Sequence, residues 1–249
     1  MSEREVTQAR SSASSKRAGT RDRIVQAAAE LLAEGGREAV STRAVAAAAG
    51  VQAPTIYRLF GDMRGLLDEV AGFGFSRYLG EKTAREVVED PVEDLRRGWD
   101  LHVGFGLANP AFYALMYGDP GTKPTAALAA EEILRELVQR IAEAGRLRVG
   151  VERAVGMIHA AGSGVVLALI GTESDQRDPA LSGAAREAIL AAVITDGSDG
   201  EATRGDGRDR AANRAVALKT ILPEAEADLT PGERALLSEL LDRIADPAR

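Results

Sequence analysis

Apolar residues recur at helical spacing along almost the whole chain, and no convincing alternating strand pattern interrupts them. Thr20 precedes the first amphipathic run, which a pair of glycines ends, so a helix is predicted to begin just after Thr20. Thr230, Pro231 and Glu233 combine an N-cap, a first-turn proline and a carboxylate at N3, which predicts another helix start. The predicted fold class is all-α, with further helices near residues 62–80, 91–107, 110–117, 124–145, 151–172, 179–194, 208–222 and 231–245.

Residues 41–60 read STRAVAAAAGVQAPTIYRLF and contain two short helical patterns that meet at one glycine. Ser41 is a good N-cap for the first helix, whose inward face carries Val45 and Ala46. Gly50 stands where the chain must reverse, and a left-handed conformation there would cost another residue roughly 1–2 kcal/mol. The order of helix, glycine turn and helix predicts a helix-turn-helix, although any tight helical hairpin could use the same spacing.

The polar residues on this helix pair favour a polyanionic partner. Four residues form the first turn of the second helix, the end that enters the major groove in such motifs: Gln52, Ala53, Pro54 and Thr55. The free N–H groups and positive end of that helix can receive a phosphate. Tyr57 can reach the DNA backbone through its hydroxyl, and Arg43 and Arg58 can reach base edges or phosphates. The alternative is a solvated polar face on an ordinary helix pair.

Charge is distributed unevenly along the chain. The net charge is −7, yet residues 1–64 hold ten basic and seven acidic residues, while 21 of the 31 basic and 31 of the 38 acidic residues lie beyond them. A basic head on an acidic body directs any polyanion to one end. Residues 1–19 are polar and Ser-rich, which predicts a flexible arm; Lys16 and Arg17 could touch phosphates, or the arm could be uninvolved. The absence of cysteine excludes disulfides and fits a cytoplasmic location.

Residues 20–80 resemble the DNA-binding head of the TetR family of bacterial transcriptional regulators. The resemblance lies in IVQAAAELLAEGG, in residues 41–60 and in a following helix that begins DMRGLL. It implies a homodimer that binds a palindromic operator and releases it when a small molecule fills a cavity in the helical body. By resemblance, Ser41 and Tyr57 occupy phosphate-contacting positions, and Arg43 and residues 52–55 face the bases. The full predicted DNA-binding set is Ser41, Thr42, Arg43, Gln52, Ala53, Pro54, Thr55, Tyr57, Arg58 and Arg64.

Two positions depart from the family pattern. Met63 stands where the family usually has a lysine, three residues after the phenylalanine, so one backbone contact is in doubt unless Arg64 replaces it. Gln52 replaces the usual serine at the start of the recognition helix, which changes the capping and could add readout of adenine. Loss of a phosphate contact should weaken binding to all sequences and flatten its salt dependence, without altering the preferred operator.

Residues 81–249 are predicted to form the ligand-binding and dimerisation body, with a mobile loop at 195–207. All ten aromatic residues lie between Tyr57 and Tyr117, and large apolar surfaces with a few polar tips are typical of a small-molecule cavity as well as of an ordinary core. The predicted ligand-binding set is Trp99, His102, Phe105, Phe112, Tyr113, Met116, Tyr117 and His159. On the family resemblance, a bound ligand would move the helix at 62–80 and change the separation of two heads.

A strip of small residues recurs every fourth position: Gly156, Ala160, Gly164 and Ala168. Another helix can approach such a strip closely, and together with residues 179–194 it would form a helical bundle between two subunits. Close packing within one chain is the alternative for the strip alone. The uncharged stretch 154–172 is nearly long enough for a membrane span, but its glycines, histidine and serine favour a buried helix.

No catalytic motif is present: the chain lacks G-x-S-x-G, a P-loop, G-x-G-x-x-G and H-E-x-x-H. The two histidines lack a nearby acidic cluster at metal-ligand spacing, so neither a metal nor a cofactor is expected. The sequence therefore predicts a ligand-responsive, cytoplasmic DNA-binding regulator rather than an enzyme. An all-helical ligand-binding or protein-interaction scaffold is the alternative, and salt-dependent duplex binding would separate the two.

Overall fold

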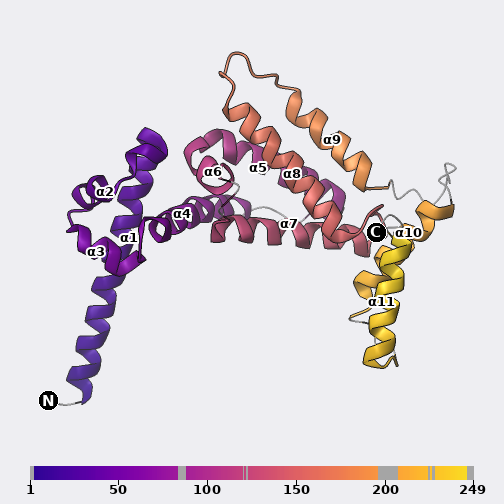
Figure 1. The fold of residues 1–249 in the computed structure, drawn as a ribbon, viewed down its shortest axis with the longest axis horizontal. Coiled ribbons are helices and arrows are strands. Elements are labelled where there is room, and N and C mark those ends of the chain that lie inside the picture. Colours follow the sequence, from indigo (N-terminus) through magenta and orange to yellow (C-terminus); the bar gives the residue numbers. More distant parts are fainter. Residues whose placement is uncertain are drawn as a thin grey trace. The chain divides into compact units, whose positions relative to one another are not determined.

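The computed structural model describes residues 3–83, 88–119, 121, 123–195, 207–223, 225 and 228–245, with side chains from residue 17 onward except at 77–83 and 207–210. Within these residues there are eleven α-helices and one isolated β-bridge, between Leu147 and Ile194 (Figure 1). The predicted all-α fold class is confirmed. The helices are α1 Glu3–Ala39, α2 Thr42–Ala48, α3 Ala53–Phe60, α4 Met63–Thr83, α5 Pro91–Ala108, α6 Pro110–Tyr117, α7 Thr125–Glu143, α8 Val151–Ile170, α9 Leu181–Val193, α10 Gly207–Ile221 and α11 Pro231–Ala245.

The first helix begins much earlier than predicted. Helix α1 starts at Glu3 and passes through Thr20, so Thr20 does not cap it, and residues 3–19 of the predicted flexible arm are helical. This segment has no proline and no glycine before Gly19, and its Ala, Arg, Lys, Glu and Gln residues are good helix formers, so nothing stops the helix at Thr20. The glycine pair acts as expected, because Gly36 has φ 66° and interrupts the helical backbone.

The chain divides into two compact units. The first contains residues 1–85 and 108–128, and the second contains residues 86–107 and 129–249. Helix α6 and the first turn of α7 thus group with the N-terminal helices, beyond the segment 20–80 that sequence patterns assign to the head. In α4, a Cβ on Gly74 would lie 2.4 Å from Cδ1 of Phe112, so α6 packs closely at this glycine.

Helices α1 to α4 form the core of the first unit. Each contributes side chains without solvent exposure, among them Ile24, Val45, Ile56 and Leu66. Burial of side chains of this size contributes roughly 1.5–3 kcal/mol each. Figure 1 shows α2 and α3 lying beside α1, the arrangement that this shared core requires. The short α2 and α3 are therefore held by tertiary packing, since isolated helices of this length are unstable in water.

In the second unit, α5 is joined to α9 by polar side chains. Trp99 is 4% exposed, and its Nε1–H donates to Ser182 Oγ at 3.0 Å. Arg96 donates from Nη2 to Glu187 at 3.1 Å, and Arg186 pairs with Asp100. These hydrogen bonds place α9 against α5, while α8 packs beside α9.

Helix α8 buries one face rather than the whole helix. Its buried residues are Ala154, Val155, Ile158, Gly162, Val166 and Leu169. The strip Gly156, Ala160, Gly164 and Ala168 is exposed, and a Cβ on either of its glycines would meet nothing within 4 Å. Among the residues that the structure describes, no segment packs closely on this strip, which does not match the alternative of close packing within one chain. By length and composition α8 could cross a membrane, with 33% of the apolar window buried, but soluble core helices pass the same test.

Helices α10 and α11 pack against each other as a helical hairpin (Figure 1). The predicted start of α11 is confirmed: Thr230 N–H donates to Glu233 Oε2 at 2.8 Å, and Glu233 N–H donates to Thr230 Oγ1 at 3.3 Å. Arg234 Nη1 donates to the carbonyl of Leu222 at 2.8 Å, which joins the two helices. The predicted mobile loop at 195–207 falls almost entirely on residues 196–206, outside the described residues.

Candidate nucleic-acid interface

The turn between α2 and α3 has the predicted geometry. The Ala44 N–H donates to Ser41 Oγ at 3.2 Å, so Ser41 is the N-cap of α2. Gly50 has φ 62°, and the next residue, Val51, donates its N–H to the carbonyl of Ala46 at 3.0 Å. This left-handed glycine reverses the chain after α2 and directs it into α3. The helix-turn-helix predicted from the spacing is confirmed.

Helix α3 separates a buried face from an outward face. Ile56, Leu59 and Phe60 are buried, whereas Tyr57 is 49% exposed and Arg58 is also exposed. The Tyr57 hydroxyl lies 3.2 Å from Thr42 Oγ1, so a hydrogen bond joins the outer surfaces of α2 and α3. The outward face is therefore an organised polar surface that spans both helices.

The predicted DNA-binding residues all lie at the surface of the first unit. Those classed as exposed are Ser41, Arg43, Gln52, Pro54, Tyr57, Arg58 and Arg64. Those half-buried are Thr42, Ala53 and Thr55. None of the ten belongs to the core, so a partner can reach each of them without rearrangement of the fold.

The two positions that depart from the family pattern lie at the starts of α3 and α4. Gln52 is the N-cap of α3 but makes no side-chain capping hydrogen bond, so its amide remains outward and exposed. Asp62 caps α4, accepting the Gly65 N–H at 2.8 Å, as the acidic start of that helix predicted. Met63 is half-buried at the first position of α4, and Arg64 beside it is exposed.

Two arginines of α1 hold this surface in place, and sequence patterns did not single them out. Arg21 donates from Nη1 to the carbonyl of Leu59 at 2.7 Å and from Nε to Glu69 at 2.8 Å. Its guanidinium also lies 4.7 Å from the ring centroid of Phe60, within the range of a cation–π interaction. Part of the positive charge of the head is therefore structural, because it fixes the end of α3 against α1 and α4.

Arg23 performs a similar task at the end of α2, where its Nε donates to the carbonyl of Ala49 at 3.2 Å. The partners of these arginines lie 26 to 48 residues away along the chain, so no local motif could have identified them. By contrast, Arg17, Arg43, Arg58 and Arg64 make no side-chain hydrogen bond or ion pair with the part of the chain that the structure describes. The charge that remains for a polyanion is thus concentrated on a few side chains.

The predicted ligand-binding residues are distributed over both units. The first unit holds Phe112, Tyr113, Met116 and Tyr117, of which the first three are buried. The ring centroids of Tyr113 and Tyr117 are 4.6 Å apart. The second unit holds Trp99, His102, Phe105 and His159. Trp99 and His102 lie beside Gly162 of α8, where a Cβ would be 3.5 Å from the indole and 3.7 Å from the imidazole. A shared cavity for these eight residues remains a prediction.

Among the side chains that the structure describes, no group of three or more His, Asp or Glu residues is arranged to hold a metal ion.

The described chain is all-helical, and its first unit contains a helix-turn-helix, a motif that many proteins use to bind DNA. Residues 24–70 match the family model of "Bacterial regulatory proteins, tetR family". No curated protein matches the chain.

Solved structures resemble most of the chain. A candidate tetR-family transcription regulator from Shewanella sp. PV-4 is 18% identical, with a TM-score of 0.56, over 71% of this chain and 99% of that one. A protein of unknown function from Rhodococcus sp. RHA1 is 25% identical, with a TM-score of 0.56, over 71% and 96%. A TetR-family regulator from Agrobacterium tumefaciens is 19% identical, with a TM-score of 0.51, over 72% and 100%. The chain therefore carries the N-terminal domain of the tetR family and has the fold of TetR-family transcriptional regulators.

Proposed function

We propose that this protein is a cytoplasmic, non-enzymatic transcriptional regulator that represses its target genes by binding a palindromic operator as a homodimer. The observation that supports this most directly is the outward face of α2 and α3, which carries exposed polar and cationic side chains and is braced from behind by Arg21 and Arg23. A rigid surface of this kind can enter the major groove with its N-terminal end.

Each side chain of the face has a role that its environment permits. Ser41 Oγ accepts the Ala44 N–H, so its hydroxyl proton can still be donated to a phosphate. The Tyr57 hydroxyl, held near Thr42, would contact the same strand. The side-chain amide of Gln52, which makes no capping hydrogen bond, would contact a base edge. A glutamine amide matches the N6 and N7 groups of adenine. Arg43 would reach a base edge or a phosphate.

A homodimer is needed because one short recognition helix reads too few base pairs, whereas two heads about 34–36 Å apart meet successive major grooves. The exposed small-residue strip of α8 supports a dimer face there, since it is open in the single chain and lets another helix approach closely. Helix α9 also exposes small residues, at Ala184, Ala188 and Ala191. The two helices would form a four-helix bundle with their copies.

Release by a small hydrophobic or aromatic ligand is the regulatory part of the proposal. Thr125, the first residue of α7, donates from its N–H to Asp68 of α4 at 2.7 Å and from its hydroxyl at 2.8 Å. Helix α7 continues from this contact into the second unit, so a ligand that displaced α7 would act on α4 through Asp68. A coupling of about 1–3 kcal/mol would weaken operator binding roughly 5–150-fold.

Genomic footprinting with the purified protein tests the DNA-binding function. We expect enrichment of one palindromic sequence, and its neighbouring genes would indicate the class of ligand. Repression is tested by placing that palindrome upstream of a reporter gene. Absence of any enriched sequence, together with the lack of salt-dependent duplex binding, would overturn the proposal and favour a scaffold protein.

A further inference from the structure

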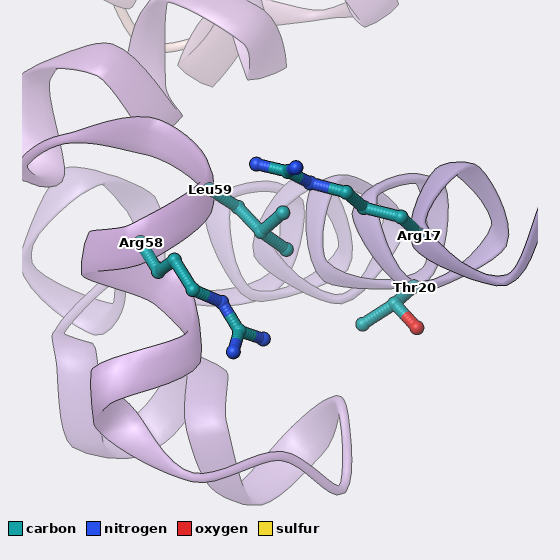
Figure 2. A pocket seen from close by; sticks show the side chains of 4 residues that line it. All are labelled: Arg17, Thr20, Arg58 and Leu59. Carbon is teal, nitrogen blue, oxygen red and sulfur yellow. The ribbon is translucent and has the colours of Figure 1, made fainter. Parts of the chain in front are cut away.

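An open pocket of about 400 Å³ lies between the last turn of α3 and the middle of α1. It is lined by Arg17, Thr20, Arg58 and Leu59 (Figure 2). Figure 2 shows Arg17 reaching from α1 toward Leu59, and Arg58 reaching from α3 into the same opening. Arg58 belongs to the helix-turn-helix, but Arg17 lies outside the matched family segment of residues 24–70. The pocket therefore joins the helical N-terminal extension to the recognition helix.

The position of Arg17 follows from the continuity of α1. Arg17 and Arg21 are four residues apart, so they project from the same face of the helix, about 6 Å apart along its axis. Arg21 fixes that face against the end of α3 through its hydrogen bond to the carbonyl of Leu59. Arg17, one turn earlier, must then project past Leu59 toward solvent. A helix that began at Thr20 would not place Arg17 there.

Within the described part of the chain, no acidic side chain pairs with the two arginines of this pocket. Glu69 pairs with Arg21, but neither Arg17 nor Arg58 has a hydrogen bond or an ion pair among the residues that the structure describes. Two guanidinium groups around one opening attract an anion, and their planar donors suit phosphate oxygens. Arg58 is also next to Tyr57 on the exposed side of α3, so the pocket borders the surface assigned to DNA.

We propose that Arg17 and Arg58 bind the phosphodiester backbone of duplex DNA beside the recognition helix, so that the helical N-terminal extension is part of the DNA interface. This inference rests on the proposed DNA-binding function. Phosphate contacts supply affinity and orientation but carry no base readout. The contact would therefore strengthen binding to every sequence equally, and it would compensate for the lysine that Met63 replaces.

The test measures binding of the full-length protein to a labelled 30-base-pair random duplex and to the selected palindrome, by fluorescence anisotropy across a salt series. Arg17→Gln should weaken both complexes equally, by about fivefold for each protomer bound, the effect of losing one exposed ion pair of roughly 1 kcal/mol per protomer. The slope of log affinity against log salt should flatten by about 0.9 for each protomer bound. Arg17→Lys should restore the slope because it keeps the charge.

Arg148→Gln is the matched control, because Arg148 is exposed in the second unit and its substitution changes the net charge by the same amount. The salt slope of this variant should equal that of the wild type. An unchanged slope in Arg17→Gln would refute the inference while leaving the proposed function intact. Stabilisation of the wild type, but not of Arg17→Gln, by millimolar inorganic phosphate with no change in DNA binding would assign the pocket to a free anion and also refute it. If the wild type bound no duplex, both proposals would fail.

Discussion

Substitution of Gly50 by alanine isolates the conformational requirement of the turn between α2 and α3. Gly50 has φ 62°, and a Cβ built there would meet nothing within 4 Å, so alanine creates no clash. The cost is then the left-handed backbone alone, about 1–2 kcal/mol for a residue with a side chain. For a domain of this size that lowers the melting temperature by roughly 2–8 °C.

Gly72→Ala is the matched control in the same unit. Gly72 lies inside α4, and a Cβ there also meets nothing within 4 Å. Because glycine inside a helix is less stable than alanine by roughly 0.5–1 kcal/mol, this variant should be more stable than the wild type. Thermal and urea unfolding followed by circular dichroism measure both variants. Equal stability of Gly50→Ala and the wild type, or a loss in both variants, would refute the assignment of a left-handed turn.

Three further predictions address packing, pH dependence and the interface. Gly74→Ala should destabilise the protein by about 1–3 kcal/mol, because the new methyl would lie 2.4 Å from the Phe112 ring; calorimetry measures the loss, and a stable variant would contradict the α4–α6 packing. Hydrogen bonds from two arginines of α5 and α9 lower the pKa of Glu187 below its usual value near 4.5, so its stabilisation is present above that pH and is lost as the pH falls through the lowered pKa. Glu187→Gln should therefore be less stable at pH 7 but equal to the wild type in acid urea titrations, and a constant difference would contradict this. Tyr57→Phe and Arg43→Ala should both weaken binding to the selected palindrome in gel shifts, and wild-type affinity in both would refute the assigned contacts.

The helix-turn-helix could be predicted because its determinants are local. Ser41 as a cap, Gly50 as the reversal and the apolar spacing of α3 act within one or two turns of the chain, and the structure confirms each. The fold class followed from helical periodicity for the same reason. The predicted helix start at Thr20 is wrong, because a residue that can cap a helix does not begin one when the residues before it also favour helix.

What could not be predicted depends on contacts between distant residues. The roles of Arg21 and Glu69 require α1 and α4 to be placed side by side, and their separation of 48 residues leaves no periodic signal. The face of α8 that is buried could not be chosen either, because both sides of this helix are apolar or small. Helix α6 groups with the N-terminal helices because it packs against both α1 and α4, in part through Phe112 on Gly74. These contacts join residues far apart in the sequence, so no local pattern predicts them.

Hydroxyl-radical footprinting on the selected palindrome tests the central claim most directly. The outward face of α2 and α3 should enter the major groove twice in each complex. The account predicts two symmetric protected patches about 10–10.5 base pairs apart, centre to centre, and weaker protection of both at the same protein concentration in Tyr57→Phe. A single patch, or protection that survives removal of the Tyr57 hydroxyl and the Arg43 side chain together, would contradict it.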